Sequence, residues 1–207
     1  GLMHDLFTRG LTPDGQLRPP PSAAPALYHE TPLGLLPKEW TPTSISSVGE
    51  VITGNTPEES SLERSDRGTP FITPGDVNAE VFVDSTERSL IGRITGRARP
   101  IPAGSICVVC IGSTIGKLAM AQRDSITNQQ INSVVCANPE LASFFYFSMS
   151  QYLPAQLRRE AGLQAVPIVN KRTFSRMLVP VPHEEQEAKE IQRRMLTATD
   201  SLAAETV

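Results

Sequence analysis

Between residues 69 and 137 the apolar residues come in short runs that are rich in Val, Ile and Thr, and turn residues separate these runs. Such runs are typical of β-strands, because an amphipathic helix needs about 10 or more residues with a 3.6-residue period. Residues 106–111 are apolar throughout, which predicts a buried strand. The sequence therefore predicts short strands at 69–73, 81–83, 105–111, 117–122 and 131–137.

Other segments carry helical or strand signals around this region. Residues 139–160 predict a helix with an apolar stripe that packs into the core, and Pro154 is expected to kink or divide it. Residues 44–52 predict a short helix, and residues 177–181 predict a last strand. The sequence as a whole predicts a mixed α/β fold, in which a globular domain of short mixed or antiparallel strands precedes a long helix.

The two ends of the chain differ from its middle. Residues 1–9 predict the end of a helix that stops at Gly10, and the Pro-, Gly- and Ser-rich residues 10–38 predict an extended linker. Residues 184–205 predict a helix with apolar residues at alternating steps of three and four. This seam favours a coiled-coil arm, with a single amphipathic helix packed on its own domain as the alternative. The seam consists of Ala188, Ile191, Met195, Ala198 and Leu202.

These signals divide the chain into three parts. Residues 1–35 are a helix end with a Pro-rich linker, residues 36–182 are the globular domain, and residues 183–207 begin the coiled-coil helix. No stretch reaches the run of about 18 apolar residues that a membrane-spanning helix needs. The first residues also lack the pattern of a signal peptide, so we expect a cytoplasmic protein without a membrane partner.

The sequence offers no convincing catalytic or metal site. Cys107 and Cys110 have C-x-x-C spacing but lie in the buried apolar run, which favours core cysteines. Residues 112–117 (GSTIGK) resemble a phosphate-binding loop, yet that loop needs four residues between its glycines and a hydroxyl after the lysine. Here three residues separate the glycines and Leu118 follows, which favours a tight turn between two strands.

Charge is unevenly distributed along the chain. The net charge is −3, which by itself argues against a nucleic-acid binder. Residues 64–176, however, hold 13 Lys and Arg against 8 Asp and Glu, and the remainder is acidic. A basic middle with acidic flanks allows a local surface that faces DNA.

Several segments, in this order, resemble the specificity subunit of type I restriction–modification systems. Each segment alone is weak, and their order across nearly the whole chain makes the resemblance specific. The segments are 1–10 (GLMHDLFTRG), 36–40 (LPKEW), 54–57 (GNTP), 70–77 (PFITPGDV), 101–105 (IPAGS), 112–117 (GSTIGK), 128–131 (NQQI), 179–182 (VPVP) and 185–186 (EQ).

The resemblance implies a fold and a function. Such subunits have two α/β recognition domains separated by two long antiparallel helices, and each domain reads half of a split double-stranded DNA target. Methyltransferase subunits, which use S-adenosylmethionine, dock on this frame, and a restriction/translocase subunit that uses ATP joins them. The specificity subunit is itself non-catalytic, so we expect no cofactor in this chain.

Candidate DNA-binding residues follow from this interpretation. Arg pairs with guanine, Asn and Gln pair with adenine, and Lys and Arg bind phosphates. Trp40 is better explained as a buried anchor at the start of the domain than as a base-stacking residue. Lys117, Asn128, Gln129 and Gln130 match motifs of the family, which favours a structural or phosphate-positioning role over base reading. For Lys117 we expect phosphate contact. The candidates are Arg64, Arg67, Arg93, Arg97, Arg99, Lys117, Asn128, Gln129, Gln130, Arg158, Arg159, Lys171 and Arg172.

Three alternatives remain open at this point. The chain holds one recognition domain, which predicts either a piece of a longer subunit, the favoured explanation, or a half-subunit that pairs with itself through the helix. A module that binds methyltransferase subunits but no DNA, such as an antirestriction protein, is consistent with the acidic flanks. A nucleotide hydrolase built on residues 112–117 is the third alternative.

Overall fold

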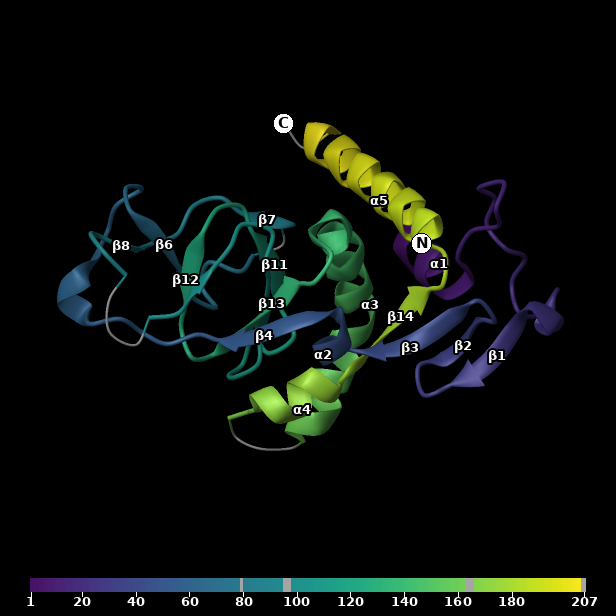
Figure 1. Cartoon of the computed structure of the whole chain (residues 1–207), viewed down its shortest axis with the longest axis horizontal. Helices are drawn as coiled ribbons and strands as arrows, with labels where there is room; N and C mark the ends of the chain where they lie inside the picture. Colours follow the sequence, from purple (N-terminus) through teal and green to yellow (C-terminus); the bar gives the residue numbers. More distant parts are fainter. Residues whose placement is uncertain (79, 95–97, 163–165, 206–207) are drawn as a thin grey trace.

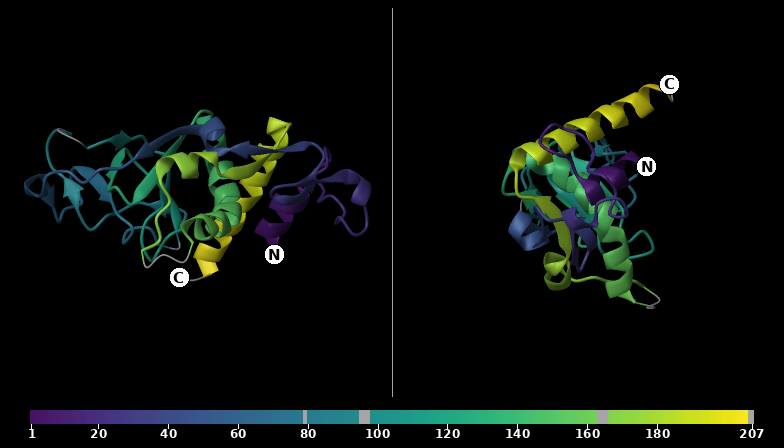
Figure 2. Two further views of the ribbon diagram at one scale, coloured as in Figure 1. Left: turned by 90° about the horizontal axis from the view of Figure 1, so that it is seen from below. Right: turned by 90° about the vertical axis from the view of Figure 1, so that its right-hand side faces the viewer.

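The computed structural model describes residues 1–78, 80–94, 98–162 and 166–205, with the side chains of 202, 203 and 205 left aside. The molecule is elongated: strands occupy one end, a long helix crosses the middle, and the N-terminal segment forms the other end (Figure 1). The C-terminal helix runs across one side of this body (Figure 2).

The predicted strands in the middle of the sequence form a central five-stranded sheet in the order β4-β13-β10-β11-β7. All neighbours are antiparallel except β11 and β7. The apolar run forms the middle strand and alternates its side chains between two core clusters, with Ile106 and Val108 on one face and Cys107 and Val109 on the other. The strands are β4 Gly49–Thr53, β7 Phe82–Val83, β10 Ile106–Val109, β11 Leu118–Ala121 and β13 Ile131–Cys136.

A second sheet of five very short strands forms the distal lobe, in the order β5-β8-β6-β12-β9. Its own small core consists of Leu62, Phe71, Leu90 and Ile126, which keeps it separate from the main core. A 3-10 turn, η2 Glu59–Ser61, leads into it. The strands are β5 Leu62–Glu63, β6 Thr69–Ile72, β8 Ser89–Leu90, β9 Pro100–Ile101 and β12 Ser125–Thr127.

The predicted helix over 139–160 is present as η3 Pro139–Leu141 followed by α3 Ala142–Ala161. The Asn138 side chain accepts a hydrogen bond from the Glu140 N–H and caps this start. Pro154 does not divide the helix, which continues through it as one element. Buried Leu153 and Leu157 hold the helix against the core on both sides of the proline, so tertiary packing outweighs the lost hydrogen bond.

The predicted helix over 44–52 is wrong in its second half. Only α2 Ile45–Val48 is helical, and the chain then extends into β4, the edge strand of the central sheet. Val51, Ile52 and Thr53 are β-branched, and their pairing with β13 overrides the helical spacing.

A two-stranded ribbon connects the central sheet to the N-terminal end. It joins β3 Trp40–Ser44 to β14 Leu178–Pro182, the predicted last strand, and places Pro42 opposite Pro180. The short helix α4 Lys171–Arg176 precedes β14, and the Asn170 side chain caps it by accepting from the Thr173 N–H.

Residues 10–38 are not the extended linker that their composition predicts. After α1 Leu2–Arg9, a turn and the 3-10 helix η1 Pro25–Leu27 lead into an antiparallel hairpin of β1 Tyr28–Thr31 and β2 Gly34–Pro37. Leu11, Arg18 and Tyr28 are buried. The segment folds because it has apolar and ionic partners on the domain, and its prolines then lie in turns. A prediction from composition alone does not include such partners.

The C-terminal helix, α5 Glu185–Glu205, begins on the domain and then leaves it (Figure 2). Ala188, Ile191 and Met195 of the expected seam are buried in the main core, so this half of the helix packs on its own domain. Ala198 is half-exposed, and the Leu202 side chain lies outside the described part. The alternative of an amphipathic helix therefore holds for the first half of the seam.

The predicted mixed α/β fold is confirmed, with several small sheets and long helices. Among the described helices, none combines the length and the apolar composition that crossing a membrane requires.

Candidate nucleic-acid interface

Three of the sequence motifs meet where strands of the central sheet begin and end, a surface that we call the motif edge. Strands β4 and β10 end at this edge, and β11 and β13 begin there, so residues 54–56, 111–117 and 128–130 become neighbours. The Gly54 N–H donates to the Ile131 carbonyl at 3.1 Å, and the Cys110 N–H donates to the Gln130 carbonyl at 2.8 Å. Segments far apart in sequence thus share one surface.

The turn of residues 128–130 is held by its own amides. Asn128 is buried, and its side chain both donates to Gln130 Oε1 and accepts from the Gln130 N–H. Gln130 Nε2 donates to the Ile111 carbonyl at 3.3 Å, whereas Gln129 is exposed and its Oε1 accepts from the Thr56 hydroxyl at 2.7 Å. Asn128 and Gln130 therefore shape the edge, and Gln129 is the amide that reaches solvent.

Gly54 is needed where it approaches this turn. A Cβ there would overlap the Thr127 hydroxyl and the carbonyls of Thr127 and Asn128. The glycine at position 54 is thus a packing requirement of the 128–130 turn, which a sequence pattern alone does not reveal.

Residues 112–117 form the predicted tight turn between β10 and β11. The N–H groups of Gly112, Ile115, Gly116 and Lys117 donate to protein carbonyls at 2.9–3.1 Å. A phosphate-binding loop needs free N–H groups that point at its ligand, and here these four are already used. The Lys117 side chain, in contrast, is exposed at the edge.

Cationic side chains gather near this edge and on the adjoining helices. Arg99 donates to the Thr53 carbonyl at 3.3 Å, and it lines a hollow of about 340 Å³ together with Lys171. Arg158 and Arg159 are exposed in the last turn of α3, and Lys171 and Arg172 are exposed on α4. These predicted residues therefore come together on one side of the molecule, at α4 in Figure 1.

Three further predicted arginines, Arg64, Arg67 and Arg93, belong to segments of the distal lobe, at the left of Figure 1. Arg64 pairs with Glu87 at 2.6 Å, while Arg67 and Arg93 are exposed. Arg97 lies outside the described residues. Two arginines that were not predicted also belong to this lobe: Arg88 pairs with Glu59, and Arg123 donates to the Asp66 carbonyl.

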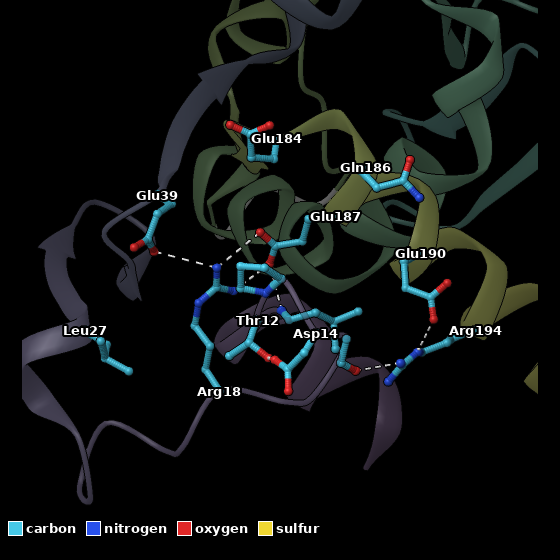
Figure 3. A pocket seen from close by; sticks show the side chains of 13 residues that line it. Thr12, Asp14, Arg18, Leu27, Glu39, Glu184, Gln186, Glu187, Glu190 and Arg194 are labelled. Atoms are coloured by element: carbon cyan, nitrogen blue, oxygen red, sulfur yellow. Dashed lines mark hydrogen bonds and ion pairs between the residues drawn. The ribbon is translucent and has the colours of Figure 1, made fainter.

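A buried ionic cluster lies at the opposite side of the domain, where the N-terminal segment meets α5. Glu187 Oε1 accepts from Arg18 Nη1 at 2.6 Å (Figure 3). It also accepts from the Leu11 N–H at 2.7 Å and from Trp40 Nε1 at 3.1 Å. Trp40 is fully buried, which confirms its interpretation as an anchor. The cluster borders a groove of about 930 Å³ that is lined mainly by acidic and apolar residues.

Gly10 completes this joint at φ +64°, a conformation that L side chains rarely adopt. A Cβ at this position would overlap Glu187, Arg18 and Trp40. The helix stop that the sequence predicts at Gly10 thus also makes room for the ionic cluster.

The three cysteines are core residues, as predicted. Cys107 and Cys110 lie on opposite faces of the central sheet, in different core clusters, so their C-x-x-C spacing does not bring the thiols together. Burial raises the pKa of each thiol, including that of Cys136, to about 12. In the described part of the chain, no group of three or more His, Cys, Asp or Glu side chains is arranged to hold a metal ion.

Comparison with protein families gives a match over most of the chain. The family described as "Type I restriction modification DNA specificity domain" matches residues 37–206. Among curated proteins, the chain is similar to the HindI specificity subunit of Haemophilus influenzae, with 33% identity over 154 residues, and to the MjaIX specificity subunit of Methanocaldococcus jannaschii, with 27% identity over 171 residues. These alignments cover 72% and 78% of this chain but 33% and 38% of the relatives, so the chain spans little more than a third of their length.

Solved structures show the same fold at low sequence identity. The HsdS subunit of Thermoanaerobacter tengcongensis superposes with a TM-score of 0.63 at 14% identity, over 90% of this chain and 44% of that one. The S subunit of a type I restriction–modification system from M. genitalium gives a TM-score of 0.58 at 13% identity, over 81% of this chain and 42% of that one.

Proposed function

Because the chain belongs to the type I restriction–modification DNA specificity domain family, we propose that it reads one half of a split double-stranded DNA target. Membership in this family confirms that the chain is a specificity component and not an enzyme. The observation that carries the proposal is that exposed cations lie at the motif edge of the central sheet: Lys117 follows its tight turn, and Arg99 bonds to the Thr53 carbonyl and lines a hollow with Lys171. Phosphate contacts of such cations supply most of the affinity for DNA.

Two groups of residues divide the work in this proposal. Lys117, Arg99 and the cations of α3 and α4 hold the DNA backbone. Base reading is assigned to Gln129 at the motif edge and to three arginines of the distal lobe, Arg64, Arg67 and Arg93. Arg97, which lies outside the described residues, stays a candidate from the sequence. Asn128 and Gln130 act by shaping the edge, since their amides are bonded within it.

The test is duplex binding by the chain at several salt concentrations. We expect affinity that falls linearly in a log–log plot against salt, and Lys117→Ala should reduce that slope by about 1. Gln129→Ala should leave the slope unchanged and alter sequence preference. Duplex affinity that is absent or insensitive to salt would contradict the proposal and favour the alternative of a module that binds only protein.

We further infer that the chain works within a complex. Methyltransferase subunits that carry S-adenosylmethionine dock on the helical side, and an ATP-dependent restriction/translocase subunit joins for cleavage. The division into residues 1–35, 36–182 and 183–207 stands as part of this proposal: the middle part recognises DNA and the outer parts supply the helical frame.

Co-expression with a methyltransferase subunit of the same system tests this part. A palindromic split motif of methylated adenines would support a half-subunit that pairs with itself, and a motif that requires a second recognition domain would support a piece of a longer subunit. A pattern of methylated adenines that is the same with and without the chain would contradict the proposed partnership.

A further inference from the structure

The cleft between the last turn of α3 and α4 contains two arginines that face the same space. Arg159 comes from α3, Arg176 comes from the last turn of α4, and the cleft measures about 380 Å³. Gln156, Glu160 and Thr173 also line it. A cleft of this size has ample room for a phosphate group.

The walls of this cleft are fixed in position. The Gln156 side chain binds both backbone groups of Leu178, because Nε2 donates to the carbonyl at 2.8 Å and Oε1 accepts from the N–H at 3.1 Å. Phe174, in the middle of α4, is fully buried in the main core. The two arginines therefore project from elements that are locked to each other, which reduces the entropy lost when they bind a ligand together.

The two arginines of the cleft outnumber its one carboxylate, that of Glu160. Across the described ranges, the structure records no ion pair or side-chain hydrogen bond for Arg159 or Arg176, although it does so for Arg18, Arg193 and Arg194. Arg172 and Arg176 are four residues apart on α4, an arrangement in which like charges repel. Such a cluster is stabilised when an anion binds between the guanidinium groups.

We propose that this cleft binds a phosphate of the DNA backbone, held by Arg159 from α3 and Arg176 from α4. The inference rests on the proposed function, because the partner it requires is the DNA that the neighbouring edge engages. It also assigns a role to Arg176, which sequence reasoning did not select. The spacing of Arg172 and Arg176 within a short helix was the available signal.

Glu160 gives the proposal a further test, because its carboxylate lines the same cleft and repels an anion there. Removing a charge should therefore act in opposite directions at neighbouring positions. Arg159→Gln and Arg176→Gln should weaken DNA binding, whereas Glu160→Gln should strengthen it. A structural role for these exposed side chains gives no reason for such opposite effects.

The experiment measures binding of the full chain to a mixed-sequence duplex between 50 and 200 mM salt. Each phosphate contact contributes about 0.9 to the slope of log affinity against log salt concentration. For each arginine variant, the factor by which affinity falls between 50 and 200 mM salt should therefore be about threefold smaller than for the unmodified chain. Arg193→Gln is the matched control, since it makes the same charge change on α5, where Arg193 already pairs with Glu190. Circular dichroism and urea unfolding should show that all variants fold equally well.

Two results overturn the inference in distinguishable ways. Slopes for Arg159→Gln and Arg176→Gln that equal that of Arg193→Gln would refute the cleft as a phosphate site, with duplex binding by the unmodified chain still supporting the proposed function. An unmodified chain without salt-dependent duplex binding would refute both.

Discussion

At the scale of single residues, burial and pairing decide what each ionisable group can do. The thiols of Cys107, Cys110 and Cys136 have pKa values raised to about 12 by burial, so at pH 8 they stay protonated and out of reach. They serve as small apolar side chains in the cores on the two faces of the central sheet, although the C-x-x-C spacing of Cys107 and Cys110 is one that metal and redox sites also use.

This burial predicts the pattern of alkylation. Iodoacetamide at pH 8 should label none of the three cysteines in the folded chain within the time that labels all three in urea, and mass spectrometry counts the adducts. Rapid labelling of a cysteine in the folded protein would contradict the assigned burial.

Glu187 is the residue on which the joint between the N-terminal segment and α5 depends. Its side chain and that of Arg18 are each 9% exposed. Removing the Glu187 charge breaks this buried pair and leaves Arg18 with the longer contact to Glu39, at 3.7 Å, whose carboxylate is more exposed. Glu187→Gln should therefore lower the free energy of unfolding by about 3–5 kcal/mol in urea titrations.

Glu184→Gln is the control for this prediction, because Glu184 lines the same groove but is exposed. That variant should stay within about 0.5 kcal/mol of the unmodified chain. Equal effects of the two substitutions would show that the ionic cluster does not hold the joint together.

At the scale of elements, the sequence predicted what local pattern determines. The strands β6, β10, β11 and β13 and the helix α3 lie within one to three residues of their predicted ranges, because their apolar periodicity is strong. The predictions fail where contacts between residues far apart in sequence determine the structure. Residues 49–53 become a strand because β13 offers an edge, and residues 10–38 fold because Leu11 and Arg18 bond to Glu187, which is far away in sequence.

The candidate site follows the same division. Its motif residues were predicted by position, yet only the fold shows that Asn128 and Gln130 bond to their own turn while Gln129 reaches solvent. Arg176 was missed because its partner across the cleft, Arg159, lies on another helix. Spacing in the sequence indicates which residues are neighbours on one helix, but not which residues face each other from two helices.

The first half of α5 gives a prediction at this scale. Ile191 is fully buried in the main core, so Ile191→Ala should destabilise the chain by about 2–5 kcal/mol, and the loss should not depend on protein concentration. Thr197→Ala, at an exposed position on the same helix, is the control. An unfolding midpoint whose shift grows as the protein is diluted would instead place Ile191 in a seam between two chains.

At the scale of the whole molecule, the two binding surfaces that we propose, for DNA and for a protein partner, lie on opposite sides. The motif edge, α4 and the end of α3 lie on one side of the elongated body, and α5 runs across the other (Figures 1 and 2). DNA and a protein partner can therefore engage the chain together, which a recognition component requires. The acidic groove beside α5 would repel DNA and keeps the two sides distinct.

The most direct measurement is selection of duplexes by the chain from a library with randomised sequence. The account predicts that one short motif is enriched, that its binding weakens steeply with salt, and that Gln129→Ala or Arg67→Ala changes the motif without lowering the salt dependence. A pool that stays random after repeated selection, or one retained equally well at high salt, would contradict the claim that this chain reads DNA.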